Sequence, residues 1–182
     1  MRPLASLALI AALAFPGPLL AQGAERLPGP VIRSAGGTFA VPEPDIETPL
    51  DRAYRIAFEV AVESPSPGAV NPGLNTAARF LNMHARAGVP PERMRVAVVV
   101  HGPAGKTLLG NAAYRARTGA DNPNLALLDE LADAGVRIIL CGQTAISRDL
   151  PWNELAEPVE TALSAMTALL LFQDEGYRVN PF

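Results

Sequence analysis

Cys141 and His101 are the two side chains whose chemistry and placement together suggest a reactive site. Cys141 is the single cysteine among 182 residues, and it follows the predicted strand 136–140 and precedes a turn at Gly142 and a helix predicted from Thr144. The free N–H groups and positive end of a helix N-terminus favour a thiolate, which is the reactive form of cysteine. His101 follows the apolar run 96–100 in the same way. Its imidazole is therefore placed to pair with the thiolate or to pass a proton to it.

Structural interpretations of both residues stay open. A lone cysteine at a strand end is often a small apolar filler, and a histidine there often only bonds to backbone. A cysteine hydrolase is also possible, with Cys141 as nucleophile, His101 as base and an orienting acid still to be identified. The second histidine, His84, lies at the edge of a helical apolar stripe, and we interpret it as a boundary residue.

Other kinds of site lack the required spacing. Residues 102–107 read Gly-Pro-Ala-Gly-Lys-Thr, but counting back from Gly105 places Val100 where a phosphate-binding loop needs its first glycine. Pro103 also removes one backbone donor from such a loop. The two histidines and the cysteine have no metal-ligand spacing, and no serine-hydrolase elbow Gly-x-Ser-x-Gly occurs. We therefore expect no metal and no cofactor.

Hydrophobic periodicity predicts the elements that must hold these residues. An alternating pattern over residues 54–62 predicts a strand with one less buried face. Asn71 and Pro72 are typical of a helix start, and Gly88 ends that helix. Further along the chain, the pattern predicts strands at 96–100, 136–140, 159–162 and 177–179, and helices at 106–117, from 122 to Gly135, from 144, and at 164–175.

This order of elements predicts an α/β fold with a mostly parallel sheet and helices on both faces. The carboxyl ends of parallel strands lie along one edge, so the loops 64–71, 101–105 and 141–144 and the turn near Ser164 should meet there. The helix at 164–175 is apolar nearly all round, which is typical of a buried helix.

The N-terminal segments have a different character. Residues 1–21 are predicted to be a signal peptide, because Arg2 precedes the apolar run 4–15 and a break at 16–18, with cleavage after Ala21. A buried N-terminal helix is the structural alternative. We expect a periplasmic or secreted protein with no membrane attachment after removal of the leader. Residues 22–50, rich in proline and glycine, are predicted to be an extended arm laid over a domain at 51–182.

Composition limits the possible partners. The chain is 49% hydrophobic and 18% charged, as expected for a folded domain. It carries 15 basic and 18 acidic residues, a net charge of −3. A nucleic-acid or anionic-membrane binder would need a basic surface. In an oxidising compartment the lone Cys141 cannot form an intramolecular disulfide, so it is either buried and inert or reactive.

A family resemblance rests on three stretches. Residues 125–145, ending in Val-Arg-Ile-Ile-Leu-Cys-Gly-Gln-Thr-Ala, resemble the signature of the DsrE/DsrF-like family, which includes the YchN and TusD proteins. Residues 98–104 and 164–177 resemble exported members of that family. The resemblance implies a three-layer α/β/α domain with a five-stranded sheet, usually assembled into trimers or hexamers. It also implies that Cys141 carries sulfur as a persulfide between protein partners, and it marks as further site residues His101, Gly102, Gly142, Gln143 and Thr144.

Two hypotheses follow. In the first, the protein is an exported sulfur carrier or sulfurtransferase that accepts sulfane sulfur on Cys141 from a protein donor and passes it to a protein acceptor. In the second, it is a non-catalytic oligomeric subunit or a small-ligand binding module of the same fold. The exposure and pKa of Cys141 distinguish them.

Overall fold

The fold is built on one parallel sheet of five strands. The computed structural model describes residues 25–180, and the predicted signal peptide at 1–21 lies outside them. The strands run in the order β4-β3-β2-β1-β5, and all neighbouring pairs are parallel. Their bounds are β1 Tyr54–Val60, β2 Met94–Val100, β3 Arg137–Cys141, β4 Val159–Ala162 and β5 Arg178–Asn180.

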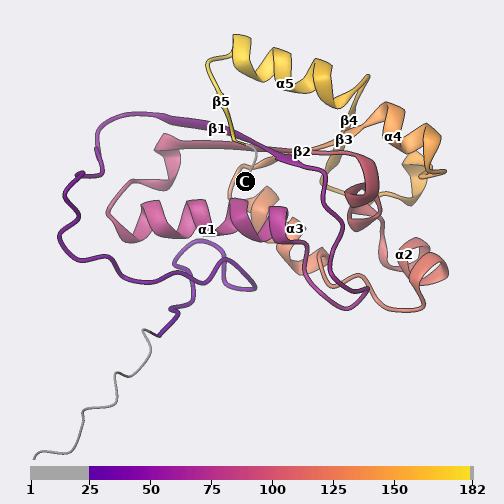
Figure 1. The fold of residues 1–182 in the computed structure, drawn as a ribbon, viewed down its shortest axis with the longest axis horizontal. Helices are drawn as coiled ribbons and strands as arrows, with labels where there is room; N and C mark the ends of the chain where they lie inside the picture. The colour runs from indigo at the N-terminus through magenta and orange to yellow at the C-terminus, as the bar shows by residue number, and fades with distance from the viewer. Residues whose placement is uncertain (1–24, 181–182) are drawn as a thin grey trace, which may run out of the picture.

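Helices cover both faces of this sheet, which confirms the predicted three-layer α/β/α class. α1 and α3 lie on one face and α5 lies on the other (Figure 1). The helices are α1 Pro72–Arg86, α2 Asn111–Thr118, α3 Leu125–Asp133, α4 Gly142–Ser147 and α5 Ala165–Asp174, with 3-10 turns at Pro91–Arg93, Gly102–Leu108 and Trp152–Glu154.

Alternation along the strands divides the core into two clusters. Phe58, Val98 and Leu140 belong to a large cluster with α1 and α3. Their strand neighbours Ala57 and Val99 face the other way, into a smaller cluster with α5. Successive residues of a strand point to opposite faces, so the two clusters follow directly from the strand assignments. The smaller cluster also contains Cys141.

The start of α1 forms as the sequence predicts. The Asn71 side chain accepts hydrogen bonds from the N–H groups of Gly73 and Leu74, which lack partners inside the helix, and Pro72 occupies the first helical position. The Asn71 backbone N–H in turn donates to the Asn124 side chain at the start of α3. These bonds tie the loop after β1 to the neighbouring helix.

The helix predicted over 106–117 is wrong in its first half. Residues Gly102–Leu108 form a 3-10 turn, Leu109 makes an isolated bridge with Leu155, and α2 starts only at Asn111. Tertiary hydrogen bonds replace the helical ones here, because the Gly110 N–H donates to the Glu154 carbonyl. The glycines and proline of this turn also have low helix propensity.

The sequence also predicts that the last helix, α5, is buried on all sides, and in the single chain this is wrong. α5 buries Ala168 and Phe172 against the sheet, whereas Met166, Leu170 and Leu171 are 79%, 58% and 55% exposed. In Figure 1, α5 lies on the outside of the sheet, and among residues 25–180 no helix covers its outer side. Its apolar composition therefore leaves an apolar outer surface.

Residues 25–50 run along the α1 side of the domain (Figure 1). Asn82 of α1 is fully buried and holds this segment through both ends of its amide. Its Oδ1 accepts the N–H groups of Val31 and Ile32, and its Nδ2 donates to the carbonyls of Ile32, Ala35 and Gly36. The Ile32 side chain is fully buried in the larger cluster.

Candidate functional site

Sheet register places Cys141 and His101 side by side at the carboxyl edge. β2 and β3 pair Val100 with Leu140, so the next residue of each strand is His101 and Cys141 respectively. The backbone at His101 is still extended, with φ −149° and ψ 177°. Both side chains therefore project to the sheet face that α5 covers.

Cys141 ends β3, and α4 starts at the next residue, Gly142, two residues earlier than the predicted start at Thr144. Burial raises the pKa of its thiol, but hydrogen bonds to the sulfur from the Thr144 N–H and hydroxyl and from the N–H groups of Ala165 and Gln143 outweigh burial, and the pKa is lowered. Thr144 and Gln143 lie in the first turn of α4, and Ala165 is the first residue of α5. The N-terminal ends of two helices thus supply donors to one sulfur.

The sulfur is less accessible than a position at the sheet edge suggests. Cys141 is only 5% exposed. It packs among Ala162, Ala165 and Ile139 in the smaller core cluster. Burial of this kind excludes bulky reagents, while the four donors keep the thiolate stable. The site therefore combines a low-pKa thiol with restricted access.

Thr144 links the two loops that carry the predicted site residues. Its buried Oγ1 accepts the N–H of Gly102 at 2.9 Å. Because one lone pair is used in this way, the hydroxyl proton is free to point at the Cys141 sulfur, where it lowers the thiol pKa. Thr144 thereby acts as a bridge from the Gly102 backbone to the sulfur.

Glycine is needed at two predicted site positions for backbone reasons. A side chain on Gly142 would put its Cβ 2.7 Å from the Ala162 carbonyl oxygen, so only glycine lets β3 turn into α4 beside β4. Gly102 has φ +56°, which L side chains rarely adopt. Gln143 contributes its backbone N–H to the sulfur, and its side chain is exposed. These residues shape the site through the main chain.

His101 has a partner that the sequence did not reveal. Its Nε2 lies 2.9 Å from Oε1 of Glu59, on the neighbouring strand β1. Glu59 alternates with the buried Ala57, so it projects to the same sheet face as Cys141. It was missed because it looked like one of several exposed polar residues on an alternating strand. The useful signal was its place at the carboxyl end of that strand, one residue before Val60.

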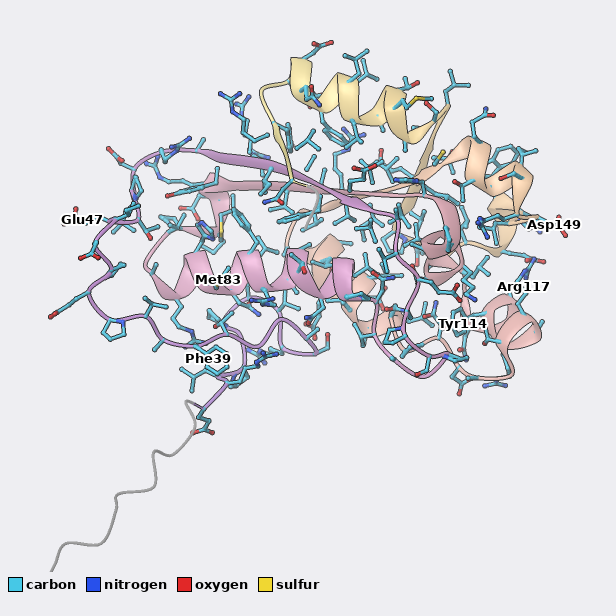
Figure 2. All side chains as sticks on the ribbon, viewed as in Figure 1. Phe39, Glu47, Met83, Tyr114, Arg117 and Asp149 are labelled. Atoms are coloured by element: carbon cyan, nitrogen blue, oxygen red, sulfur yellow. The ribbon has the colours of Figure 1, made fainter. Side chains whose placement is uncertain are left out.

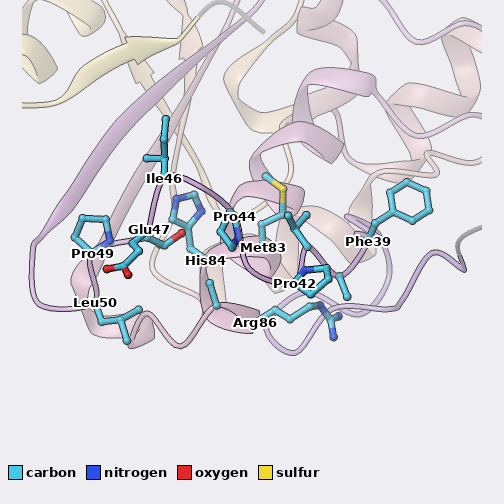
Figure 3. A pocket seen from close by; sticks show the side chains of 14 residues that line it. Phe39, Pro42, Pro44, Ile46, Glu47, Pro49, Leu50, Met83, His84 and Arg86 are labelled. Atoms are coloured by element: carbon cyan, nitrogen blue, oxygen red, sulfur yellow. The ribbon is translucent and has the colours of Figure 1, made fainter.

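A pocket lies away from Cys141 and His101, at the end of α1. Residues between 39 and 50 arch over the end of α1 and enclose about 870 Å³ with Met83, His84 and Arg86 (Figure 3). Phe39, Glu47 and Met83 lie at one end of the molecule and Tyr114, Arg117 and Asp149 at the other (Figure 2). The lining includes none of the predicted site residues.

Residues 25–180 contain neither a candidate metal site nor a candidate membrane span. No group of three or more histidine, cysteine, aspartate or glutamate side chains in this range is arranged to hold a metal ion. No helix in the same range has the length and apolarity needed to cross a bilayer.

Residues 55–181 match the DsrE/DsrF-like family. The chain belongs to this family, which is generally associated with sulfur relay. No curated protein matches the sequence. Among solved structures, the chain is similar to the YchN protein of E. coli, with a TM-score of 0.53 and 13% sequence identity. It is also similar to MTH1491 of Methanobacterium thermoautotrophicum, a protein of unknown function, with a TM-score of 0.50 and 19% sequence identity. Each comparison covers 71% of this chain and 99% of the other, and at these identities it supports the fold alone.

Proposed function

We propose that this DsrE/DsrF-like protein is an exported sulfur carrier that holds sulfane sulfur as a persulfide on Cys141. The observation that carries the proposal is the position of Cys141 at the end of β3, directly before α4, where N–H groups at the starts of α4 and α5 lower the pKa of its thiol. Donors directed at a buried sulfur favour an anion there, and a thiolate is the form that attacks sulfane sulfur. A structural cysteine does not need them.

The transfer consists of two thiol exchanges. The Cys141 thiolate attacks the outer sulfur of a donor persulfide R–S–SH, a new S–S bond forms to Cys141, and the bond to the inner sulfur breaks. The donor thiolate leaves with the electron pair and takes a proton. An acceptor thiolate then attacks the outer sulfur on Cys141 and releases the Cys141 thiolate. No external oxidant or reductant is consumed, because each step exchanges one S–S bond for another.

Intact-mass measurement tests this function. Incubation of the native protein with a small alkyl persulfide should add one sulfur atom, and a thiol reductant should remove it. Cys141→Ser should form no adduct and should keep its fold. The restricted access to Cys141 predicts faster loading from small donors than from bulky ones. An adduct that appears only after unfolding would refute the proposal.

The burial of Cys141 is the observation that favours the alternative function. A buried, unreactive cysteine would suit a non-catalytic subunit or a small-ligand binding module of the same fold. Loading of the native protein is the result that separates the two functions, because a binding module needs no covalent chemistry at this residue.

We also propose that the protein forms homo-oligomers, as trimers or hexamers, through the α5 side. Large apolar side chains are exposed on α5 and just before its start, namely Leu163, Met166, Leu170 and Leu171. Exposed apolar surface of this kind marks an interaction site. Met166→Glu with Leu170→Glu should convert the oligomer to monomers in light scattering. Ile46→Glu, at an 87% exposed site, is the matched control. A wild-type monomer throughout the micromolar range would refute self-association.

Export is proposed from the sequence of residues 1–21, which lie outside the described residues. N-terminal sequencing of the mature protein should find Gln22 as the first residue or one close to it. Retention of Met1 in the mature protein would contradict export. Protein donors and acceptors would then be sought in the periplasm or outside the cell.

A further inference from the structure

Three side chains with acid–base or nucleophilic chemistry stand in a row across the carboxyl edge of the sheet. Glu59 is on β1, His101 follows β2 and Cys141 ends β3, and these are three neighbouring strands. All three project to the face under α5. The pairing of Val100 with Leu140 sets His101 level with Cys141 on strands about 4.8 Å apart. Glu59 pairs with Val99, two residues before His101, and its side chain reaches His101 through the 2.9 Å bond from Oε1 to Nε2.

The central histidine has a defined proton arrangement. A carboxylate has no proton to donate, so the hydrogen between Glu59 Oε1 and His101 Nε2 belongs to Nε2. The ring then has Nδ1 as the nitrogen that takes up and releases a proton. Glu59 fixes both the tautomer and the direction of the ring, because the 2.9 Å bond joins it to one nitrogen only.

The surroundings argue against a purely stabilising ion pair. The Glu59 and His101 side chains are 37% and 28% exposed, and pairs this exposed add little to stability. The residues next to the pair on this sheet face are apolar, with Ala57, Ala97 and Val99 on the same two strands, and the arginines of this face, Arg55 and Arg95, lie at the other end of the strands. His101 is the polar partner that the structure gives to the Glu59 carboxylate within residues 25–180. A charged pair at this place is thus best explained by its neighbour Cys141.

We propose that Glu59 is a positioning residue that holds His101 ready to protonate the thiolate leaving the donor during sulfur loading of Cys141. This inference rests on the proposed function and adds a proton path to it. As the donor S–S bond breaks, the leaving sulfur takes the electron pair, and the proton carried by His101 Nδ1 goes to that sulfur. His101 is then reprotonated from water. Protonation matters most when the leaving thiolate is strongly basic.

Two donors of nearly equal size test this role. Ethyl persulfide releases a strongly basic thiolate, and 2,2,2-trifluoroethyl persulfide releases a weakly basic one. Glu59→Gln should slow loading from the ethyl donor roughly tenfold to a hundredfold, and loading from the fluorinated donor much less. Glu59→Asp should recover part of the loss. Glu63→Gln is the matched control, because Glu63 pairs with Lys106 and should leave both rates unchanged.

Two further measurements separate positioning from a general structural effect. Alkylation by iodoacetamide releases iodide, which needs no proton, so its rate should be the same in wild type and Glu59→Gln. The double variant Glu59→Gln/His101→Asn should load no more slowly than His101→Asn alone, because both changes remove the same proton path.

The possible failures are distinguishable. Equal slowing of both donors and of alkylation by Glu59→Gln would overturn the positioning role, because it would indicate a distorted site. Normal loading of Glu59→Gln from the ethyl donor would also overturn it while leaving the sulfur-carrier function intact. A wild-type protein that loads from neither donor would overturn the proposed function and this inference together.

Discussion

Removal of the Thr144 hydroxyl should raise the pKa of Cys141. Thr144→Val keeps the shape of the side chain but deletes the O–H that donates to the sulfur. A hydrogen bond to a charged group contributes about 1.5–3 kcal/mol. This energy is lost by the thiolate and much less by the neutral thiol, so the pKa of Cys141 should rise. Burial of the sulfur leaves no water to replace the lost donor.

The assay is the pH dependence of iodoacetamide alkylation, checked by the ultraviolet absorbance of the thiolate. Thr144→Ser keeps the hydroxyl and is the control, so its profile should stay near that of wild type. Thr144→Val should also lose stability, by about 1–3 kcal/mol, because the Gly102 N–H loses its acceptor. Identical profiles for Thr144→Val and wild type would refute the proposal that this hydroxyl stabilises the thiolate.

Three further predictions concern the same fold. Gly142→Ala should push the β4–α5 turn away, since its Cβ would lie 2.7 Å from the Ala162 oxygen. The variant should lose about 1–3 kcal/mol in the free energy of unfolding, measured with denaturant, and the pKa of Cys141 should rise. Asn82→Ala should cost about 3 kcal/mol or more and expose residues 25–50 to limited proteolysis. Folding lowers the pKa of Cys141, so the ionised thiol stabilises the folded wild type relative to Cys141→Ser. This difference in the free energy of unfolding should increase as pH rises through the lowered pKa and become constant above about 8.5, the pKa of an unfolded cysteine. The difference should disappear as pH falls below the lowered pKa.

The sequence by itself determined the order and type of most elements. Alternation at residues 54–62 and the hydrophobic runs at 96–100 and 136–140 predicted β1, β2 and β3, because a two-residue period and a short run of mostly apolar residues each suit a strand. Asn71 with Pro72 and Ser164 predicted helix starts, since their local hydrogen bonds do not depend on distant residues. The carboxyl-edge location of Cys141 and His101 followed from the parallel order.

Only the tertiary structure decided what surrounds those two residues. The start of α2 moved to Asn111 because Gly110 bonds to Glu154, more than forty residues away along the chain. Glu59 could not be distinguished from other polar strand residues until the structure showed its carboxylate bonded to His101, two residues beyond its register partner Val99. The donors to Cys141 come from two separate helices, so their convergence depends on packing.

The same physical reason explains the apolar surface of α5. An apolar helix can bury its outer side under another layer of the same chain or against another subunit. The amino-acid composition of the helix is the same in both cases, so the sequence does not distinguish them. Within residues 25–180 no further layer lies outside α5, and Met166 and Leu170 are exposed. Local propensity and periodicity are properties of neighbouring residues and can be read from the sequence. Register, burial and side-chain partners depend on residues far apart in the chain, and only folding brings them together.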